Sequence, residues 1–529
     1  MQQLHTLEGL QCCLATWRQP IQTAPDATPE IASVGLVPTM GALHGGHLSL
    51  IQRARQENDR VIVSIFVNPL QFGPGEDLDR YPRPLTKDLA QCEATGVDAV
   101  FCPSPAVLYG AASPDAATLT QVVPPPALIR HLCGPHRPGH FAGVTTVVTK
   151  LLALMQPTRA YFGQKDAQQR VILQQLVADL NLPVTVVGCA IVREADGLAL
   201  SSRNQYLTPE ERAQATALHQ GLQAAERAFE QGERQADQLL KQVTGALAAA
   251  PLVQPQYVEL VDPQTLAPLK TLQGTGLLAI AAHLGKTRLI DNLVLRSRQP
   301  IIAIDGPAGA GKSTVARLVA EELGLLYLDS GAMYRAVTWR VLQAGIDPSD
   351  EVAVAELLSD CDIRLGANPS QGGQPSPSRV WVNEEEVTQA IRTPTVTAQV
   401  STVAAQPMVR QVLLRQQQAY GEAGGLVMEG RDIGTHVFPA AELKIFLTAS
   451  VQERARRRQQ DLANQNQPAL SLADLERAID ERDRKDSTRR VAPLRKAEGA
   501  IELVTDGLAI EQVVSKIVGF YHQALAPSP

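Results

Sequence analysis

Short apolar runs rich in β-branched residues alternate with helical patterns over the first 190 residues. The runs are VGLVPT (34–39), RVIVSIFVN (60–68), VDAVFCP (97–103), RAYFG (159–163) and PVTVVGCAIV (183–192). Strands that alternate with helices indicate a parallel α/β sheet. We therefore predict a Rossmann-like α/β domain over residues 1–190.

The pattern changes after Thr208. An Ala- and Gln-rich stretch with helical spacing (208–250) is followed by two strand-like runs, PQYVELVD (255–262) and GLLAIAAHLG (276–285). This pattern predicts a smaller α+β subdomain over residues 191–292. A new α/β pattern begins directly afterwards with PIIAIDG (300–306), so we predict a second domain over residues 297–529. Within it, the Pro/Gly/Ser-rich segment 366–378 is expected to be a loop between the strand-like DIRL and RVWVN.

The length of the chain indicates several domains, and its composition is typical of a cytoplasmic protein. The chain has 529 residues, beyond the ~250–300 residues at which single cores stop growing. Its net charge of -6 offers no basic surplus for nucleic acid. The seven cysteines form no C-x-x-C pair, which argues against a disulfide framework or a zinc site and favours a reducing compartment. No apolar stretch reaches the ~18 residues of a membrane span, so we expect neither a membrane nor a nucleic-acid partner.

A phosphate-binding motif opens the second domain. Residues 306–313 read G-x-x-x-x-G-K-S, after an apolar strand and before a helical pattern, which is the context that a P-loop requires. Glycines there let backbone N–H groups face the phosphates at the helix N-terminus. The predicted ATP-binding residues are Gly306, Pro307, Ala308, Gly309, Ala310, Gly311, Lys312, Ser313 and Thr314. Lys312 is the expected catalytic cation, and Ser313 is the expected ligand of Mg²⁺.

Arginine-rich motifs follow the P-loop in a fixed order: YLDSGAMYRA, STVAAQPMVRQ, MEGRDIG, ERARRR and ERDRKDSTR. Phosphoryl transfer needs several cations that hold donor and acceptor in line. In these motifs the second domain resembles the cytidylate kinase family over about residues 297–525. Uridylate and adenylate kinases are more distant alternatives.

The resemblance implies roles for individual side chains in the kinase domain. Ser330, Arg335, Arg431 and Asp432 would contact the nucleoside monophosphate, and Ser401 and Arg410 would hold its base and sugar. Arg482, Asp486 and Arg489 would contact phosphate, ribose and CMP, respectively. Residues 453–458 would belong to a closing lid, and the segment around 361–385 would be an extra monophosphate-binding insert.

The first domain carries His44 and His47 in an H-x-G-H motif between an apolar strand and a helix. Two imidazoles at a helix N-terminus, with glycine between them, suit a triphosphate that approaches the backbone. Further polar motifs follow at strand ends: FVNPLQFG, YFGQKDAQQ and VREADGLALSSRN. Ligands of open α/β sheets bind beyond the carboxyl ends of the strands, so these loops can converge. Lys165 and Arg203 would neutralise phosphates, and glutamines would orient a polar acid.

These motifs resemble the pantothenate synthetase family over about residues 30–292. The family condenses pantoate with β-alanine through a pantoyl-adenylate, using ATP and Mg²⁺. The resemblance implies an ATP site formed by Met40, Gly41, Ala42, Leu43, His44, Gly45, Gly46, His47, Gly163, Gln164, Lys165, Asp166, Val192, Leu200, Ser201, Ser202 and Arg203. Gln71 and Gln169 would bind pantoate, and His47 would be the proton donor; His44 and Lys165 would assist it in catalysis.

The chain therefore reads as a fusion of two enzymes, a pantoate–β-alanine ligase that forms AMP and a kinase of CMP or dCMP. The resemblance also implies a homodimer through the first unit. Two alternatives remain at this stage. One half could be a regulatory module that binds nucleotide without turnover, or the H-x-G-H motif could belong to an enzyme that acts on tRNA. The departures from the ligase pattern at Gly45, Gln164 and Ala167 concern local charge and packing at the ATP site.

Overall fold

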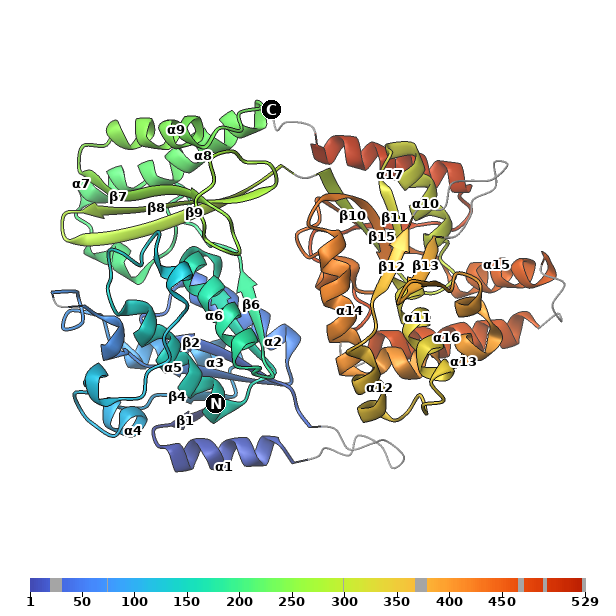
Figure 1. Cartoon of the computed structure of the whole chain (residues 1–529), viewed down its shortest axis with the longest axis horizontal. Helices are drawn as coiled ribbons and strands as arrows, with labels where there is room; N and C mark the ends of the chain where they lie inside the picture. Colours follow the sequence, from blue (N-terminus) through green and yellow to red (C-terminus); the bar gives the residue numbers. More distant parts are fainter. Residues whose placement is uncertain are drawn as a thin grey trace. The chain divides into compact units, whose positions relative to one another are not determined.

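The computed structural model describes residues 1–19, 31–73, 75–297, 299–366, 378–464, 471–488 and 492–525. The chain divides into two compact units, residues 1–297 and 298–529 (Figure 1). Each unit is described by itself below.

The first unit is built on a six-stranded parallel sheet with the order β1-β4-β3-β2-β5-β6. Its strands are β1 (Gln2–Leu4), β2 (Val34–Thr39), β3 (Arg60–Ile65), β4 (Ala99–Phe101), β5 (Arg159–Gly163) and β6 (Thr185–Cys189). The predicted parallel α/β sheet is confirmed. Strand β1 was not predicted: three residues at the N-terminus give too short a run to show a period.

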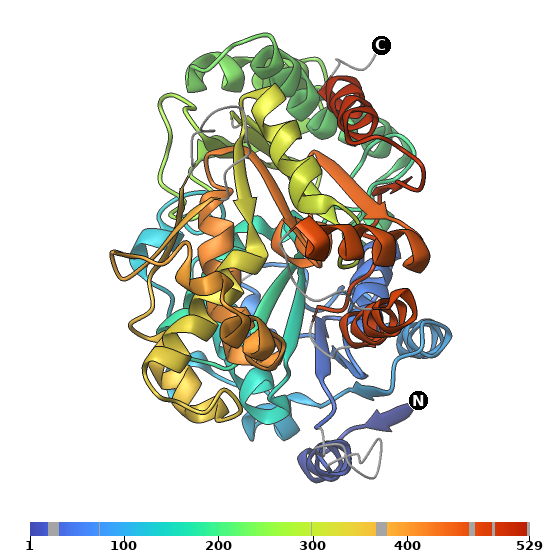
Figure 2. The ribbon, with the colours of Figure 1, turned by 90° about the vertical axis from the view of Figure 1, so that its right-hand side faces the viewer.

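Helices cover both faces of this sheet (Figures 1 and 2). On one face lie α1 (Leu7–Trp17), α5 (His140–Met155) and α6 (Ala167–Asp179), and on the other lie α2 (Gly45–Glu57) and α3 (Leu85–Ala94). Leu36 and Val37, neighbours on β2, are both fully buried in different hydrophobic clusters. Since successive strand residues point to opposite faces, this sheet is apolar on both sides.

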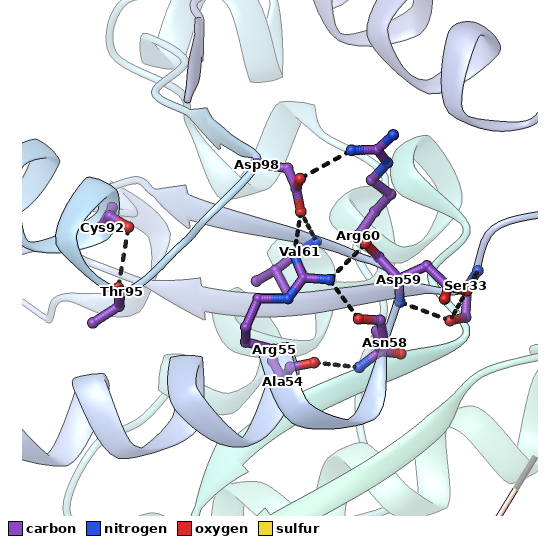
Figure 3. Close-up of polar contacts among 10 residues, drawn as sticks. All are labelled: Ser33, Ala54, Arg55, Asn58, Asp59, Arg60, Val61, Cys92, Thr95 and Asp98. Atoms are coloured by element: carbon purple, nitrogen blue, oxygen red, sulfur yellow. Dashed lines mark hydrogen bonds and ion pairs between the residues drawn. The ribbon is translucent and has the colours of Figure 1, made fainter. Parts of the chain in front are cut away.

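A polar network connects α2 to the residues at the start of β3 and just before β4 (Figure 3). Asp98 accepts hydrogen bonds from Arg55 Nη1 at 2.6 Å, from Arg60 Nη1 at 3.1 Å and from the amide of Val61 at 2.7 Å. Arg55 also donates to the carbonyls of Asn58 and Asp59. This network closes the turn after α2 and so fixes the helix whose N-terminus carries the H-x-G-H motif.

Shorter helical elements connect the strands of the first unit. They are η1 (Pro69–Gln71), α4 (Pro105–Tyr109), η2 (Ala116–Thr118), η3 (Pro126–Ile129), η4 (Gln164–Asp166) and η5 (Ser202–Tyr206).

The predicted α+β subdomain consists of three helices and an antiparallel sheet of the order β7-β8-β9. Its elements are α7 (Pro209–Ala215), α8 (Ala217–Glu230), α9 (Ala236–Ala248), β7 (Val253–Val261), β8 (Thr275–Leu284) and β9 (Thr287–Arg296). Leu278 and Ile280 of β8 pack in the cluster formed with α8 and α9, whereas Leu277 and Ala279 pack in the cluster that includes residues of α5 and α6. The sheet is therefore the layer between its own helices and the parallel-sheet domain.

The second unit has a five-stranded parallel sheet of the order β11-β15-β10-β16-β17. Its strands are β10 (Gln299–Asp305), β11 (Leu326–Asp329), β15 (Gly424–Gly430), β16 (Leu443–Thr448) and β17 (Ile501–Val504). Helices α10 (Lys312–Leu323) and α17 (Ile510–Leu525) pack on one face. Helices α11 (Ser330–Gln343), α12 (Glu351–Leu358), α13 (Pro394–Ala405) and α14 (Pro407–Tyr420) belong to the cluster on the other face.

A small antiparallel sheet, β12-β13-β14, is inserted in the second unit. It is formed by β12 (Ile363–Gly366), β13 (Arg379–Val382) and β14 (Glu385–Glu386). The predicted strands in DIRL and RVWVN are confirmed; most of the predicted loop between them, residues 367–377, lies outside the described residues. The remaining elements are η6 (Ala390–Arg392), η7 (Ile433–Val437), α15 (Val451–Asn464) and α16 (Leu472–Thr488).

Among the described residues, no helix combines the length and the apolar character needed to cross a membrane.

Candidate active sites

The first site lies where the order of the parallel strands reverses. Strands β2 and β5 are neighbours in the sheet, yet the chain leaves them toward opposite edges, which makes the carboxyl ends of these strands the usual ligand position. A cavity of about 220 Å³ lies there. Fourteen residues of the predicted ATP and pantoate sites line it: Met40, His44, Gly46, His47, Gln71, Gly163, Lys165, Asp166, Gln169, Val192, Leu200, Ser201, Ser202 and Arg203.

The two histidines stand together at the N-terminus of α2. Their ring centroids are 4.1 Å apart, and His44 Nδ1 accepts a hydrogen bond from the amide of Gly46 at 3.1 Å. This bond leaves the proton of the neutral His44 ring on Nε2. Burial and the neighbouring Lys165 lower the pKa of His44 to about 4, and burial together with His44 and Lys165 lowers the pKa of His47 to about 3. Both rings are therefore neutral at pH 7 and act as hydrogen-bond donors or acceptors.

The loop before these histidines is held by Asp88, a residue that the sequence analysis missed. The Asp88 carboxylate is 1 % exposed and accepts hydrogen bonds from the amides of Ala42 and Leu43, each at 2.8 Å. Ala42 has a φ of 51° and Gly41 one of 80°, so the loop passes through left-handed backbone that the carboxylate stabilises. Asp88 is separated by 41 residues from His47 in the sequence, and only the packing of α3 on α2 brings it here.

The cations of the cavity differ in their partners. Lys165 donates to the carbonyl of Leu200 at 3.1 Å, and burial lowers its pKa. Arg203 donates through Nε and Nη2 to the two carboxylate oxygens of Asp77, both at 2.9 Å, and its guanidinium lies 5.7 Å from the ring centroid of Tyr81. Arg203 is thus oriented by a bidentate ion pair, whereas the hydrogen bond described for Lys165 goes to a carbonyl. Both positive groups remain available to phosphate oxygens at the cavity wall.

Gln71 is positioned through its backbone. Its carbonyl accepts hydrogen bonds from His140 Nδ1 at 2.8 Å and from Arg137 Nη2 at 3.3 Å, and its side-chain oxygen accepts from Asn68 Nδ2 at 2.9 Å. Gly143 of α5 allows this approach, because a Cβ atom there would lie 2.1 Å from the carbonyl oxygen of Leu70.

Five predicted ATP-site residues do not line the cavity. Gly41, Ala42, Leu43 and Gly45 form the backbone that carries the histidines. Gln164 lies at the start of η4, where its side-chain amide donates to Asn292 Oδ1 at 3.3 Å. These residues shape the loop and its link to β9.

The second site lies at the P-loop after β10. Gly309 and Gly311 have φ values of 77° and 85°, and Gly306 has one of 151°. A Cβ atom on Gly306 would lie 1.9 Å from the carbonyl oxygen of Leu447, so no larger residue fits there. Gly311 caps α10, whose first residue is Lys312. The loop thus presents its amides at a helix N-terminus, as a phosphate site requires.

Buried charges surround Lys312. This lysine is 5 % exposed, its ammonium group donates to the carbonyl of Pro307 at 2.8 Å, and burial and Arg431 lower its pKa. Glu429 at the end of β15 is buried close by, and burial and Asp329 raise its pKa. Asp305 accepts from the amides of Ile433 and Gly434 at 2.8 and 2.7 Å, and its burial raises its pKa to about 6. Asp305 and Glu429 were not singled out from the sequence.

Acidic partners hold the predicted monophosphate-binding arginines in place. Arg335 pairs with Asp329 at 2.5 Å, and Arg431 pairs with Asp486 at 2.9 Å. The buried Arg410 pairs with Asp432 at 2.5 Å and lies 5.4 Å from the ring centroid of Tyr334. The ion pairs therefore orient several arginines that come from separate elements.

The other predicted residues of the second site differ in whether their described contacts join this network. Ser330 is buried at the start of α11 and donates to the carbonyl of Glu429 at 2.7 Å. Arg482 on α16 interacts electrostatically with Arg431 and Arg335. Ser401 is exposed on α13, and the described contacts do not bring its side chain into the network. Arg489 lies outside the described residues.

Two further arginines join the second site that the sequence analysis did not assign individually. Arg454 of α15 is 4 % exposed, donates to the carbonyl of Ala308 in the P-loop at 3.2 Å and pairs with Asp483 at 2.6 Å. Arg392 of η6 interacts electrostatically with Arg335 and Asp329. The predicted lid segment 453–458 therefore includes a side chain that contacts the P-loop directly.

Comparisons with known proteins match the two units to two enzyme families. The Pantoate-beta-alanine ligase family model matches residues 4–294, and the Cytidylate kinase family model matches residues 302–523. The bifunctional pantoate ligase/cytidylate kinase of Trichormus variabilis is 58 % identical over 99 % of this chain and 100 % of that protein. The protein of the same name from Synechococcus elongatus is 57 % identical over 98 % of this chain and 95 % of its own.

Solved structures match the first unit. The crystal structure of pantothenate synthetase from Thermus thermophilus covers 55 % of this chain and 99 % of that protein, with 43 % sequence identity and a TM-score of 0.50. Together with the full-length relatives, this match favours catalytic proteins in both halves over a tRNA enzyme or a regulatory module. The chain belongs to the family of bifunctional pantoate ligases/cytidylate kinases, enzymes that join a pantoate–β-alanine ligase to a cytidylate kinase.

Proposed function

We propose that the first unit condenses pantoate with β-alanine through a pantoyl-adenylate, and that the second unit transfers the γ-phosphoryl group of ATP to CMP or dCMP. The observation that supports the ligase assignment best is the single cavity that His44, His47, Lys165, Gln71 and Gln169 share. The kinase assignment is supported by the P-loop together with the ion-paired arginines from α11, α14 and the end of β15.

The ligase reaction has two steps. A carboxylate oxygen of pantoate attacks the α-phosphorus of ATP, and the bond to the bridging oxygen breaks so that pyrophosphate leaves. The amine nitrogen of β-alanine then attacks the acyl carbon and loses a proton, and AMP leaves as the acyl C–O bond breaks. Negative charge builds up on phosphate oxygens in the first step, so preorganised donors stabilise its transition state.

The ligase residues suit these steps. Neutral His44 and His47 would donate hydrogen bonds to phosphate oxygens, and His47 would fill the proton-donor role expected of it through such a hydrogen bond. Lys165 and Arg203 would balance the charge of the triphosphate, while Gln71 and Gln169 would orient pantoate. The low pKa values of both histidines favour hydrogen bonding over permanent positive charge. Loss of one such donor typically costs roughly 10²- to 10³-fold in rate.

In the kinase unit the protein has little covalent work to do, because phosphoryl transfer depends on position and charge. The P-loop amides and Lys312 would hold the ATP phosphates. Arg335, Arg431 and Arg482 would hold the phosphate of the acceptor, and Arg410 with Asp432 would fix its base and sugar. Phosphate oxygens would compete with Asp329 and Asp486 for the arginines, so binding exchanges one set of ion pairs for another.

Both families are expected to use Mg²⁺ with ATP. The donor set at the P-loop fits this ion: Ser313 is exposed on the first turn of α10, and its hydroxyl hydrogen-bonds the Glu429 carboxylate. Mg²⁺ prefers oxygen ligands and takes most of them from phosphates and water. We therefore propose Ser313 as a ligand, together with the phosphates. Bound there, the ion would neutralise charge on the transferred phosphoryl group.

We further propose the domain limits 1–190, 191–292 and 297–529, a homodimer formed through the first unit, and a location in the cytoplasm. All seven cysteines are free thiols, as a reducing compartment favours. Light scattering on the full chain and on residues 1–297 would test the dimer. Dimeric masses for both support it, and a monomeric first unit contradicts it.

Chromatography of nucleotide products tests the two activities. Incubation with Mg-ATP, pantoate and β-alanine should give AMP, and omission of either acid should prevent it. Incubation with Mg-ATP and CMP should give CDP and ADP. A reaction with UMP or AMP that exceeds the one with CMP would contradict the acceptor assignment.

A further inference from the structure

A second cavity adjoins the ligase site. It has a volume of about 40 Å³ and lies between the parallel-sheet domain and the antiparallel sheet β7-β8-β9. Lys165, Asp166 and Gln169 form part of its wall and also line the larger cavity. A water molecule needs about 10–15 Å³ measured in this way, so the cavity has room for a group of the size of a carboxylate. It extends the ligase site away from the H-x-G-H loop.

Arg288 of β9 lines this cavity and has no acidic partner within ion-pair distance among the residues that the structure describes. Its Nε donates to Gln256 Oε1 at 2.9 Å, and its Nη2 donates to Cys133 Sγ at 3.2 Å. A thiol is a weak acceptor. A half-buried guanidinium with only neutral partners is costly unless an anion joins it.

The other arginines around the two cavities are already paired. Arg137 donates through Nε and Nη2 to the two oxygens of Glu76, at 2.8 and 2.6 Å. Arg203 makes the corresponding bidentate pair with Asp77. Lys165 has no carboxylate within ion-pair distance in the described part of the chain, but it lies at the shared wall, beside the histidines that would hold phosphate. Arg288 is therefore the arginine lining these cavities for which the described residues provide no carboxylate partner.

We propose that the smaller cavity is the subsite for the carboxylate of the amine substrate, β-alanine, and that Arg288 binds this carboxylate. The inference rests on the proposed ligase function. β-Alanine carries two charged ends, and its amine must reach the acyl carbon in the larger cavity. With its carboxylate on Arg288, the substrate would extend past the shared lining residues into the larger cavity. Its amine would then face the acyl-adenylate. The carboxylate itself stays unchanged in the reaction.

This arrangement makes Arg288 a specificity-determining residue. An amine without a carboxylate gains nothing from the guanidinium, so the enzyme should prefer β-alanine over propylamine or 3-amino-1-propanol. The first half-reaction does not involve the amine, so adenylate formation should be independent of Arg288. The two half-reactions thus separate substrate binding at Arg288 from general damage to the site.

The test compares Arg288→Met and Arg288→Lys with the wild-type chain. Pantoate-dependent exchange of labelled pyrophosphate into ATP reports adenylate formation, and steady-state rates over a range of β-alanine concentrations report its KM. A hydrogen bond between charged groups gives about 1.5–3 kcal/mol, or roughly 10- to 150-fold in affinity. We expect Arg288→Met to raise the KM for β-alanine by that factor, to leave pyrophosphate exchange within twofold, and to lose the preference for β-alanine over propylamine. Arg288→Lys should recover part of the effect.

Arg296→Met is the matched control, because Arg296 lies on the same strand and is exposed. It should change neither half-reaction. A KM for β-alanine within twofold of wild type in Arg288→Met would overturn the proposal, and so would a parallel loss of exchange and amide formation. In the wild-type chain, equal use of propylamine and β-alanine would overturn it without any variant. Absence of pantoate-dependent exchange in the wild-type chain would instead contradict the ligase function itself.

Discussion

At the scale of single residues, Asp88 shows how a side chain can control a site that it does not line. Both of its carboxylate oxygens hold amides of the loop that carries His44 and His47. In Asp88→Asn, the amide nitrogen replaces one acceptor and leaves one buried N–H without a partner, which typically costs about 1–3 kcal/mol. We expect the pantothenate-forming kcat/KM for ATP to fall roughly 10- to 100-fold if this energy acts on the loop.

Kinase activity of the same chain is the internal control for Asp88→Asn and should not change. A ligase rate equal to that of the wild type would show that the two hydrogen bonds do not order the loop.

The histidines predict how the first unit responds to acid. The pKa values of His44, His47 and His140 are lowered to about 4, 3 and 3, chiefly by burial, against about 6.5 in the unfolded chain. The unfolded state therefore binds more protons below pH 6.5, and the stability of the neutral rings is lost as the pH falls from about 6.5 toward 4 and 3. Each group adds a slope of up to about 1.4 kcal/mol per pH unit.

Thermal melts of residues 1–297 between pH 7.5 and 4.5 measure this effect. The melting temperature should decrease as the pH is lowered below 6.5. In His140→Gln it should decrease less steeply than in the wild type, because one of the three groups is removed. Parallel curves for the two chains would contradict the assignment of a neutral, buried His140.

At the scale of elements, α5 determines where η1 and Gln71 lie. In Gly143→Ala the added Cβ would collide with the carbonyl oxygen of Leu70, which is backbone and cannot rotate away. We expect η1 to move, the KM for pantoate to rise, and the melting temperature of the first unit to fall. The matched control is Gly245→Ala on α9, where an added Cβ meets nothing within 4 Å. Alanine in that helix should stabilise the unit by about 0.5–1 kcal/mol. Equal effects of both substitutions would contradict the close approach of α5 and η1.

Helix α15 provides the corresponding test in the kinase unit. Arg454 connects this helix to the P-loop carbonyl of Ala308 and to Asp483 on α16. Arg454→Met should leave Asp483 without its cation and reduce kinase kcat/KM at least tenfold, since a hydrogen bond to a charged group typically contributes about 1.5–3 kcal/mol. Arg456→Met on the exposed side of α15 should stay within twofold of wild type. Similar losses in both variants would show that Arg454 acts only through the general charge of the helix.

Sequence patterns predicted most elements that position the sites, because a buried strand or amphipathic helix carries its own period. They did not reveal β1, whose three residues pair with β4 only in the folded sheet. Nor did they reveal Asp88 or Asp305, or single out Arg454 within the predicted lid segment, since these residues act through contacts that link distant segments. The motif residues could be predicted from the chain, but the side chains that orient them required tertiary structure.

At the scale of the whole molecule, the two proposed ATP sites lie on unrelated loops of two different parallel sheets. The ligase cavity is lined only by residues of the first unit, and the described contacts of the P-loop come from the second. The described residues of each site therefore belong to a single unit. We infer that the chain contains two catalytic sites that work independently.

Cross-inactivation tests this claim most directly. Pantothenate and CDP formation would be measured side by side in the wild-type chain, His47→Gln and Lys312→Met. We predict that His47→Gln lowers pantothenate formation roughly a hundredfold or more and leaves CDP formation within twofold of wild type. Lys312→Met should lower CDP formation and leave pantothenate formation within twofold of wild type. Loss of both activities in either correctly folded variant would show that the two sites depend on each other.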